Sequence, residues 1–203
     1  MKPSTRWRQR HTADERGATM VELAFILPLF ILLIFGLLEF GLMFRERMTI
    51  ASATQSAART GATMGTSDEA DFRILQALEE GLVGQVDPGV ILTVDIFKAN
   101  PVTGEPLGPR DGYIYDGSLS GCKWDPCPDP TLATIPFGSP ATWPPSVRDT
   151  ILEASSGGGL DVLGVEVVYR HSAITNVLPY LNRDLTERAL VRLEPDLFGS
   201  AGP

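Results

Sequence analysis

The chain has 203 residues, of which 43% are hydrophobic and 21% are charged, an ordinary composition for a globular protein. This length accommodates one membrane anchor and one domain of ordinary size. The formal net charge is −8, yet residues 1–17 carry five basic and two acidic side chains, a net of +3, which leaves −11 for the rest. An acidic body argues against nucleic acid as a partner, because phosphate binding needs clustered Lys and Arg.

An apolar segment follows the basic start. Between Leu23 and Phe44 the only ionisable residue is Glu39, and these 22 residues would span about 33 Å as a helix, against a bilayer core of about 30 Å. Pro28 is tolerated in a membrane helix. The basic residues favour a cytoplasmic position for residues 1–17 and an extracytoplasmic position for residues 45–203. Glu39 lies near the far end and is expected to extend toward the outer interface.

A cleaved secretory signal peptide is the main alternative, and Ala51-Ser52-Ala53 superficially fits its cleavage site. However, the apolar core is longer than the about 7–15 residues of a signal peptide, and Arg45-Glu46-Arg47 separates it from the alanines. A helical pattern continues through these alanines to Gly61. We therefore expect a retained helix that ends near Thr60, at Gly61, Gly65 and Thr66.

The chain beyond this helix predicts a small α+β domain. Thr66-Ser67-Asp68-Glu69 predicts a capping box for a second helix, with an apolar stripe that contains Phe72, Ile74, Leu75, Leu78 and Leu82. Alternating apolar residues predict strands at 90–97, 163–171 and 185–193, and a short strand around 113–115. Three or four antiparallel strands against a helix would bury one core. The core face of the first strand is predicted to contain Val90, Leu92, Val94 and Ile96.

Residues 99–160 are rich in Pro and Gly, which predicts mostly loop, with Trp124 and Trp143 packing it onto the body. The glycine-rich run at 155–159 predicts a flexible link. Cys122 and Cys127 are close in sequence, which favours a local disulfide in an oxidising compartment. Free thiols are the second possibility, and a metal site is disfavoured because zinc needs four ligands.

No catalytic constellation is present in the sequence. His11 and His171 lie on opposite sides of the predicted span, and His171 is predicted to be a structural surface residue. There is no phosphate loop, nucleophile elbow, dinucleotide fingerprint or paired metal-binding histidine. Ser155 and Ser156 lie in a glycine-rich stretch that is a poor setting for a nucleophile. We therefore expect no enzyme activity and no cofactor, and an anchored enzyme with its site in residues 99–160 is disfavoured.

Glu22 is the first residue that calls for a functional explanation. Its carboxylate lies at the start of the apolar segment, five residues after Gly17. A charge in the bilayer is unfavourable by roughly 2.5–3.5 kcal/mol near a helix centre and by less toward the edge. Some other group should therefore compensate for this charge.

Several stretches of sequence carry a resemblance to a known family: Arg16-Gly17-Ala18-Thr19-Met20-Val21-Glu22-Leu23-Ala24-Phe25-Ile26-Leu27-Pro28, Phe35-Gly36-Leu37-Leu38-Glu39-Phe40-Gly41, Ala57-Ala58-Arg59-Thr60-Gly61-Ala62 and Val191-Arg192-Leu193-Glu194-Pro195. In them the chain resembles the TadE-like family of minor pilins, or pseudopilins, of the tight-adherence (Flp) pilus system. The N-terminal part of the resemblance is fairly specific, the C-terminal part is short, and residues 99–160 take no part in it.

The resemblance implies that a prepilin peptidase cuts after Gly17 and leaves Ala18 as the new N-terminus. Glu22 is then the fifth residue of the mature chain, and its carboxylate meets the free amine of a neighbouring subunit. Such an ion pair in a low-dielectric setting would set register rather than add net stability. The family often has Phe after this glutamate, whereas this chain has Leu23.

Together these observations predict a basic cytoplasmic leader at 1–17, a transmembrane helix with its extension at 18–62, and an extracytoplasmic α+β domain at 63–203 with a loop-rich insert at 99–160. The resemblance implies a pilin-like domain in a single-pass protein of the cytoplasmic (inner) membrane. Such a subunit would support assembly of a surface pilus used in adhesion or secretion. Its partners would be the lipid bilayer, the prepilin peptidase, other pilin-like subunits and the assembly machinery. The alternative is an unprocessed, membrane-tethered adhesion or scaffold module.

Overall fold

The computed structural model describes residues 11–129, 142–151, 159–174 and 182–195. Its helices are α1 (His11–Met64) and α2 (Ala70–Leu82), with 3-10 turns η1 (Pro88–Val90) and η2 (Pro145–Val147). Its strands are β1 (Ile91–Ala99), β2 (Asp111–Tyr115), β3 (Trp124–Asp125), β4 (Val162–His171) and β5 (Arg183–Arg192).

The strands form one antiparallel sheet in the order β3-β2-β1-β4-β5. This arrangement confirms the predicted α+β class and the long N-terminal apolar helix. The sheet has five strands instead of three or four, because the two-residue strand β3 pairs with β2 inside the segment that was predicted to be loop. The glycine-rich run at 155–159 lies largely outside the described residues.

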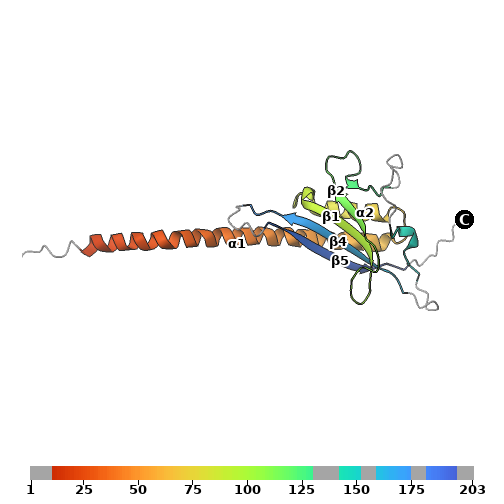
Figure 1. Cartoon of the computed structure of the whole chain (residues 1–203), viewed down its shortest axis with the longest axis horizontal. Helices are drawn as coiled ribbons and strands as arrows, with labels where there is room; N and C mark the ends of the chain where they lie inside the picture. Colours follow the sequence, from red (N-terminus) through yellow and green to blue (C-terminus); the bar gives the residue numbers. More distant parts are fainter. Residues whose placement is uncertain (1–10, 130–141, 152–158, 175–181, 196–203) are drawn as a thin grey trace, which may run out of the picture.

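Helix α1 belongs to two different environments. It has 54 residues, which corresponds to a length of about 81 Å, and it continues through Pro28. Its N-terminal half extends away from the rest of the chain, whereas its C-terminal half lies beside α2 on one face of the sheet (Figure 1). The same helix is therefore an isolated rod at one end and part of a packed domain at the other.

The predicted end of α1 near Thr60 is wrong, since the helix continues to Met64. Gly61 does not break it, because glycine is needed there for packing: a Cβ would lie 2.5 Å from side-chain atoms of Ile74 and of Leu163. Gly65, which was also predicted to end the helix, does so. Its φ is +53°, and its N–H donates to the Gly61 carbonyl at 3.2 Å, which is a left-handed C-terminal cap.

Helix α2 begins without the predicted capping box. No side chain caps its N-terminus, and the Ala70 N–H donates to the backbone carbonyl of Ser67 at 2.9 Å. Glu69 pairs with Arg73 at 3.0 Å, one turn further along. The predicted apolar stripe is confirmed at the fully buried residues Ile74, Leu75, Leu78 and Leu82.

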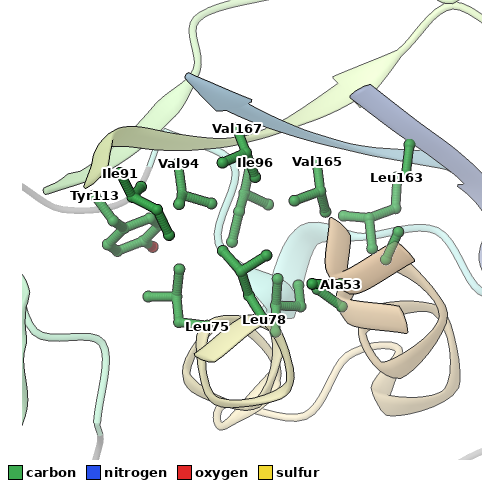
Figure 2. Close-up of a cluster of buried hydrophobic side chains, with 14 of the residues drawn as sticks. Ala53, Leu75, Leu78, Ile91, Val94, Ile96, Tyr113, Leu163, Val165 and Val167 are labelled. Carbon is green, nitrogen blue, oxygen red and sulfur yellow. The ribbon is translucent and has the colours of Figure 1, made fainter. Parts of the chain in front are cut away.

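The hydrophobic core lies between the sheet and the two helices. Figure 2 shows β1 and β4 side chains directed toward Ala53 of α1 and toward Leu75 and Leu78 of α2. The helices approach each other closely at Gly81 of α2, where a Cβ would lie 2.7 Å from the Cβ of Ala53. The predicted alternation in β4 is confirmed, since its buried core residues are Leu163, Val165, Val167 and Tyr169.

In β1 the predicted core face is partly wrong. Val94 and Ile96 face the core as predicted and Val90 packs partly against it, but Ile91 takes the place in the core that was predicted for Leu92. The pairing register with β4 shifts between Ile91 and Thr93. Because an irregularity of this kind adds a residue to one strand, the alternation of faces before it is reversed.

On the opposite face of the sheet, arginine side chains pack over a buried aromatic ring. Phe97 is fully buried there, and the guanidinium groups of Arg110 and Arg188 lie 5.2 and 5.6 Å from its ring centroid. Both arginines pair with the carboxylate of Glu166. A Cβ at Gly164 would lie 2.4 Å from the Phe97 ring, so glycine makes room for it.

Candidate membrane anchor and assembly site

The candidate site is the uncovered half of α1. From Gly17 onward this helix is long and apolar enough to cross a membrane, and none of its most apolar window is buried against the rest of the chain. Large apolar side chains point outward all around it, from Met20 to Phe44. A helix that is hydrophobic on every side needs an apolar environment, which for a single helix of this length is a bilayer or a bundle of similar helices.

Gly17 and Glu22 lie on the exposed surface of this helix. A Cβ at Gly17 would contact nothing within 4 Å, so packing within this chain does not require glycine there. In the part of the chain that the structure describes, no side chain pairs with the Glu22 carboxylate. Among the described residues, the structure therefore brings neither residue to a side-chain partner.

The second acidic residue of the apolar segment has a different environment. The Glu39 side chain is buried, with 1% of its surface exposed, and its Oε2 accepts the Ile174 N–H at 3.1 Å. The Glu39 side chain is therefore covered by the chain itself, and its position relative to the membrane interface stays a prediction. The carboxylate is enclosed by the chain that follows β4, 135 residues further along the sequence.

The positions of the two carboxylates fix how deep Glu22 would lie in a bilayer. Residues 23–38, which separate Glu22 from Glu39, span about 24 Å as a helix, which is less than the about 30 Å of a bilayer core. If Glu39 marks one boundary, the core reaches down to about Thr19. Glu22 then lies inside the hydrocarbon region.

Two further contacts hold β4 and β5 to α1 just above Glu39. His171 Nδ1 lies 2.5 Å from the Glu46 carboxylate, and Arg47 Nε donates to Glu187 at 2.6 Å. The prediction that His171 lies on the surface is wrong, because its side chain is almost fully buried between β4 and α1. Burial raises the pKa of the neighbouring Tyr169 to about 12, and the negative charges of Glu187 and Glu46 act in the same direction.

A separate polar cluster holds the insert against the body. Arg148 pairs with Asp71 of α2, and both side chains are almost completely buried. The Arg148 guanidinium also stacks on Trp143, 4.7 Å from the ring centroid. Asp71 Oδ2 accepts the Tyr113 hydroxyl at 3.1 Å, and burial together with the Asp71 charge raises the pKa of Tyr113.

The cysteines and tryptophans of the insert also lie against the core. Cys122 and Cys127 are joined by a disulfide, with 5.9 Å between their Cα atoms. Trp124 and Trp143 are buried, which confirms that they pack this segment onto the body. Asp111 of β2 fixes the backbone next to Trp143, whose N–H it accepts at 3.0 Å.

Metal-binding chemistry has no evident location in the described residues. No group of three or more His, Cys, Asp or Glu side chains in these ranges is arranged to hold a metal ion. The one histidine whose side chain is described, His171, contacts Glu46 inside the domain. Ser155 and Ser156 lie outside the described residues.

Comparison with known proteins places the similarity at this same helix. Residues 17–59 match the family model described as TadE-like protein, which confirms the N-terminal resemblance. No curated protein and no solved structure matches the chain. The matched segment contains Gly17, Glu22 and Glu39, together with the part of α1 that carries the contacts to β4 and β5. The match and the exposed apolar helix together support a membrane-anchored protein related to the Tad pilus.

Proposed function

We propose that the chain is a minor pilin or pseudopilin that supports assembly of a Tad-type surface pilus, used in adhesion or secretion. The observation that carries this proposal is the charge of Glu22 on an uncovered apolar helix, within the segment that matches the TadE-like model. Its partner would come from a second subunit.

The chemistry of assembly follows from cleavage after Gly17. A prepilin peptidase would remove the leader at 1–17 and create a free α-amine at Ala18. That positively charged amine would pair with the carboxylate of Glu22, the fifth residue of the mature chain, in a neighbouring subunit. An ion pair in an apolar setting costs desolvation energy, so its main effect would be to set the axial register between helices. The leader would remain on the cytoplasmic side and the domain would lie outside the inner membrane.

This proposal assigns no catalysis to the chain. Its other partners would be the bilayer, further pilin-like subunits and the assembly machinery, which would recognise the uncovered helix. A disulfide between Cys122 and Cys127 agrees with a domain that is exported to an oxidising compartment.

Processing can be tested by intact-mass measurement of the chain purified from membranes. Cleavage after Gly17 should remove about 2 kDa of the 22.0 kDa chain and leave a mass that begins at Ala18. Substitution of Gly17 should prevent that shift. A wild-type mass that begins at Met1 would contradict processing and favour the unprocessed tethered module.

Assembly can be tested with Glu22→Ala, because that change removes the charge without shortening the apolar segment. Insertion into the membrane should be unchanged or improved, whereas filament formation should be impaired. Glu80→Ala provides a matched control, since it removes an exposed carboxylate from α2. Normal filaments in cells that carry Glu22→Ala would remove the proposed role of Glu22.

A further inference from the structure

Among the described strands, β4 ends nearest to the uncovered half of α1 (Figure 1). Strand β4 runs toward that half and β5 returns from it (Figure 1). Three contacts join this end of the β4–β5 hairpin to α1, from Glu187 to Arg47, from His171 to Glu46 and from Ile174 to Glu39.

The contact with Glu39 sets the level of the hairpin along the helix axis. Because the Ile174 N–H donates to the Glu39 carboxylate at 3.1 Å, the backbone of Ile174 lies beside Glu39. Below this level α1 is uncovered over residues 17–38, which span about 33 Å and are apolar apart from Glu22. A bilayer core of about 30 Å fits that length, and on this basis we place its boundary at Glu39, beside Ile174.

The side chains at this level agree with a lipid boundary. Ile174 is apolar and 73% exposed, and Phe40 of α1 is also exposed. Transfer of an exposed isoleucine side chain from water to a nearby apolar phase lowers the free energy. Glu39, in contrast, is shielded by the hairpin backbone and does not face the apolar phase.

We propose that the described end of the β4–β5 hairpin, Ser172 to Ile174, is a membrane-contact surface that rests on the bilayer at the level of Glu39, with the Ile174 side chain among the phospholipid headgroups. The occupant is a phospholipid bilayer because the surface is continuous with the apolar surface of α1. The proposal rests on the membrane anchor in the proposed function and does not depend on pilus assembly.

The experiment uses the full chain, reconstituted in vesicles of phosphatidylethanolamine and phosphatidylglycerol. An environment-sensitive fluorophore is attached at Ile174→Cys, and at Ser172→Cys as a second position, while the native disulfide is kept oxidised. Val102→Cys is the aqueous control, because Val102 is 90% exposed in the β1–β2 connection at the opposite end of the sheet. Leu29→Cys, on the uncovered helix, is the control within the lipid.

Iodide in water and nitroxide-labelled headgroups in the bilayer serve as the two quenchers. The label at Ile174 should lose its quenching by iodide on insertion and gain quenching by the headgroup nitroxide, and the label at Ser172 should follow it. The label at Val102 should remain quenched by iodide alone.

Two results would overturn the proposal. Equal quenching by iodide at Ile174 and Val102 would place the hairpin in water, and protection of Ile174 from both quenchers would show that protein, such as a second copy, covers it. A chain that fails to float with the vesicles would remove both this proposal and the membrane anchor. Normal filaments with Glu22→Ala would remove the assembly role alone.

Discussion

Asp71 and Asp184 each pair with an arginine, but their replacement by Ala should have very different effects on stability. Asp71 and Arg148 have side chains that are 5% and 0% exposed, and the Tyr113 hydroxyl donates to the same carboxylate. Asp184 and Arg170 form a pair of ordinary geometry at 2.8 Å, in which both side chains are about half exposed. The two aspartates therefore separate the effect of burial from the effect of pairing.

The magnitude follows from what each substitution leaves behind. Without Asp71, the guanidinium of Arg148 remains charged and buried, and its Nε and Nη1 already lack hydrogen-bond partners among the described residues. Removal of one partner of a buried pair costs about 3–5 kcal/mol. For a chain of this size, that cost lowers the melting temperature by about 6–20 °C. At the Asp184 pair, water and ions replace the lost partner, so the melting temperature should stay near that of the wild type.

Thermal unfolding of the full chain in detergent, followed by near-ultraviolet circular dichroism of its three tryptophans, measures both variants. The double variant Asp71→Leu with Arg148→Met should recover most of the loss, because it removes both charges and keeps the apolar volume. If Asp71→Ala lowers the melting temperature no more than Asp184→Ala does, the buried pair does not hold the insert to α2 and the reasoning fails.

Two other predictions concern the opposite face of the sheet and high pH. Gly164→Ala should destabilise the domain by about 1–3 kcal/mol, because the new Cβ would lie 2.4 Å from the ring of the buried Phe97. Gly108→Ala is the control, since a Cβ at Gly108 would have no neighbour within 4 Å. Equal denaturation midpoints for the two variants would contradict the prediction. Burial raises the pKa of Tyr169 to about 12 in the folded chain, whereas an unfolded tyrosine ionises near pH 10. The unfolded state therefore releases the proton first as the pH rises. The stability that the folded state gains from the neutral Tyr169 is lost between about pH 10 and about pH 12. Tyr169→Phe should flatten that decline in urea unfolding measured over this range, and an unchanged slope would count against it.

The elements that sequence reasoning located correctly are those whose cause is local. Alternation in β4 predicts Val165, Val167 and Tyr169 on the core face because a strand directs every second side chain to one side. The stripe of α2 follows from helical periodicity in the same way. The uncovered half of α1 follows from its composition, and this is also the region that the family comparison matches.

The predictions that failed depend on contacts between distant parts of the chain. The helix-breaking tendency of Gly61 is overcome because Ile74 and Leu163 pack where its side chain would be. The register shift in β1 is a property of its pairing with β4, so alternation within β1 alone cannot place it. Sequence cannot show either effect before the fold is known.

For Glu39, the sequence predicts the position in the apolar segment but not the environment of the side chain. A carboxylate near the end of an apolar run is a signal that a partner is needed. One partner is the backbone N–H of Ile174, and such an N–H can be supplied by any residue other than proline, so the identity of Ile174 does not signal this contact. Asp71 and Arg148 likewise lie 77 residues apart without a shared motif.

The continuity of α1 has a mechanical consequence. No turn separates the uncovered half of α1 from the half that packs against α2 and the sheet, so the two halves move as one rigid helix. A force along the helix axis is therefore transmitted directly to the core, where α1 would have to slide past β4 and β5 in shear. A rotation of the uncovered half about the helix axis would turn the sheet by the same angle. Contacts that fix the rotation of this helix therefore also fix the direction in which the outer face of the sheet points.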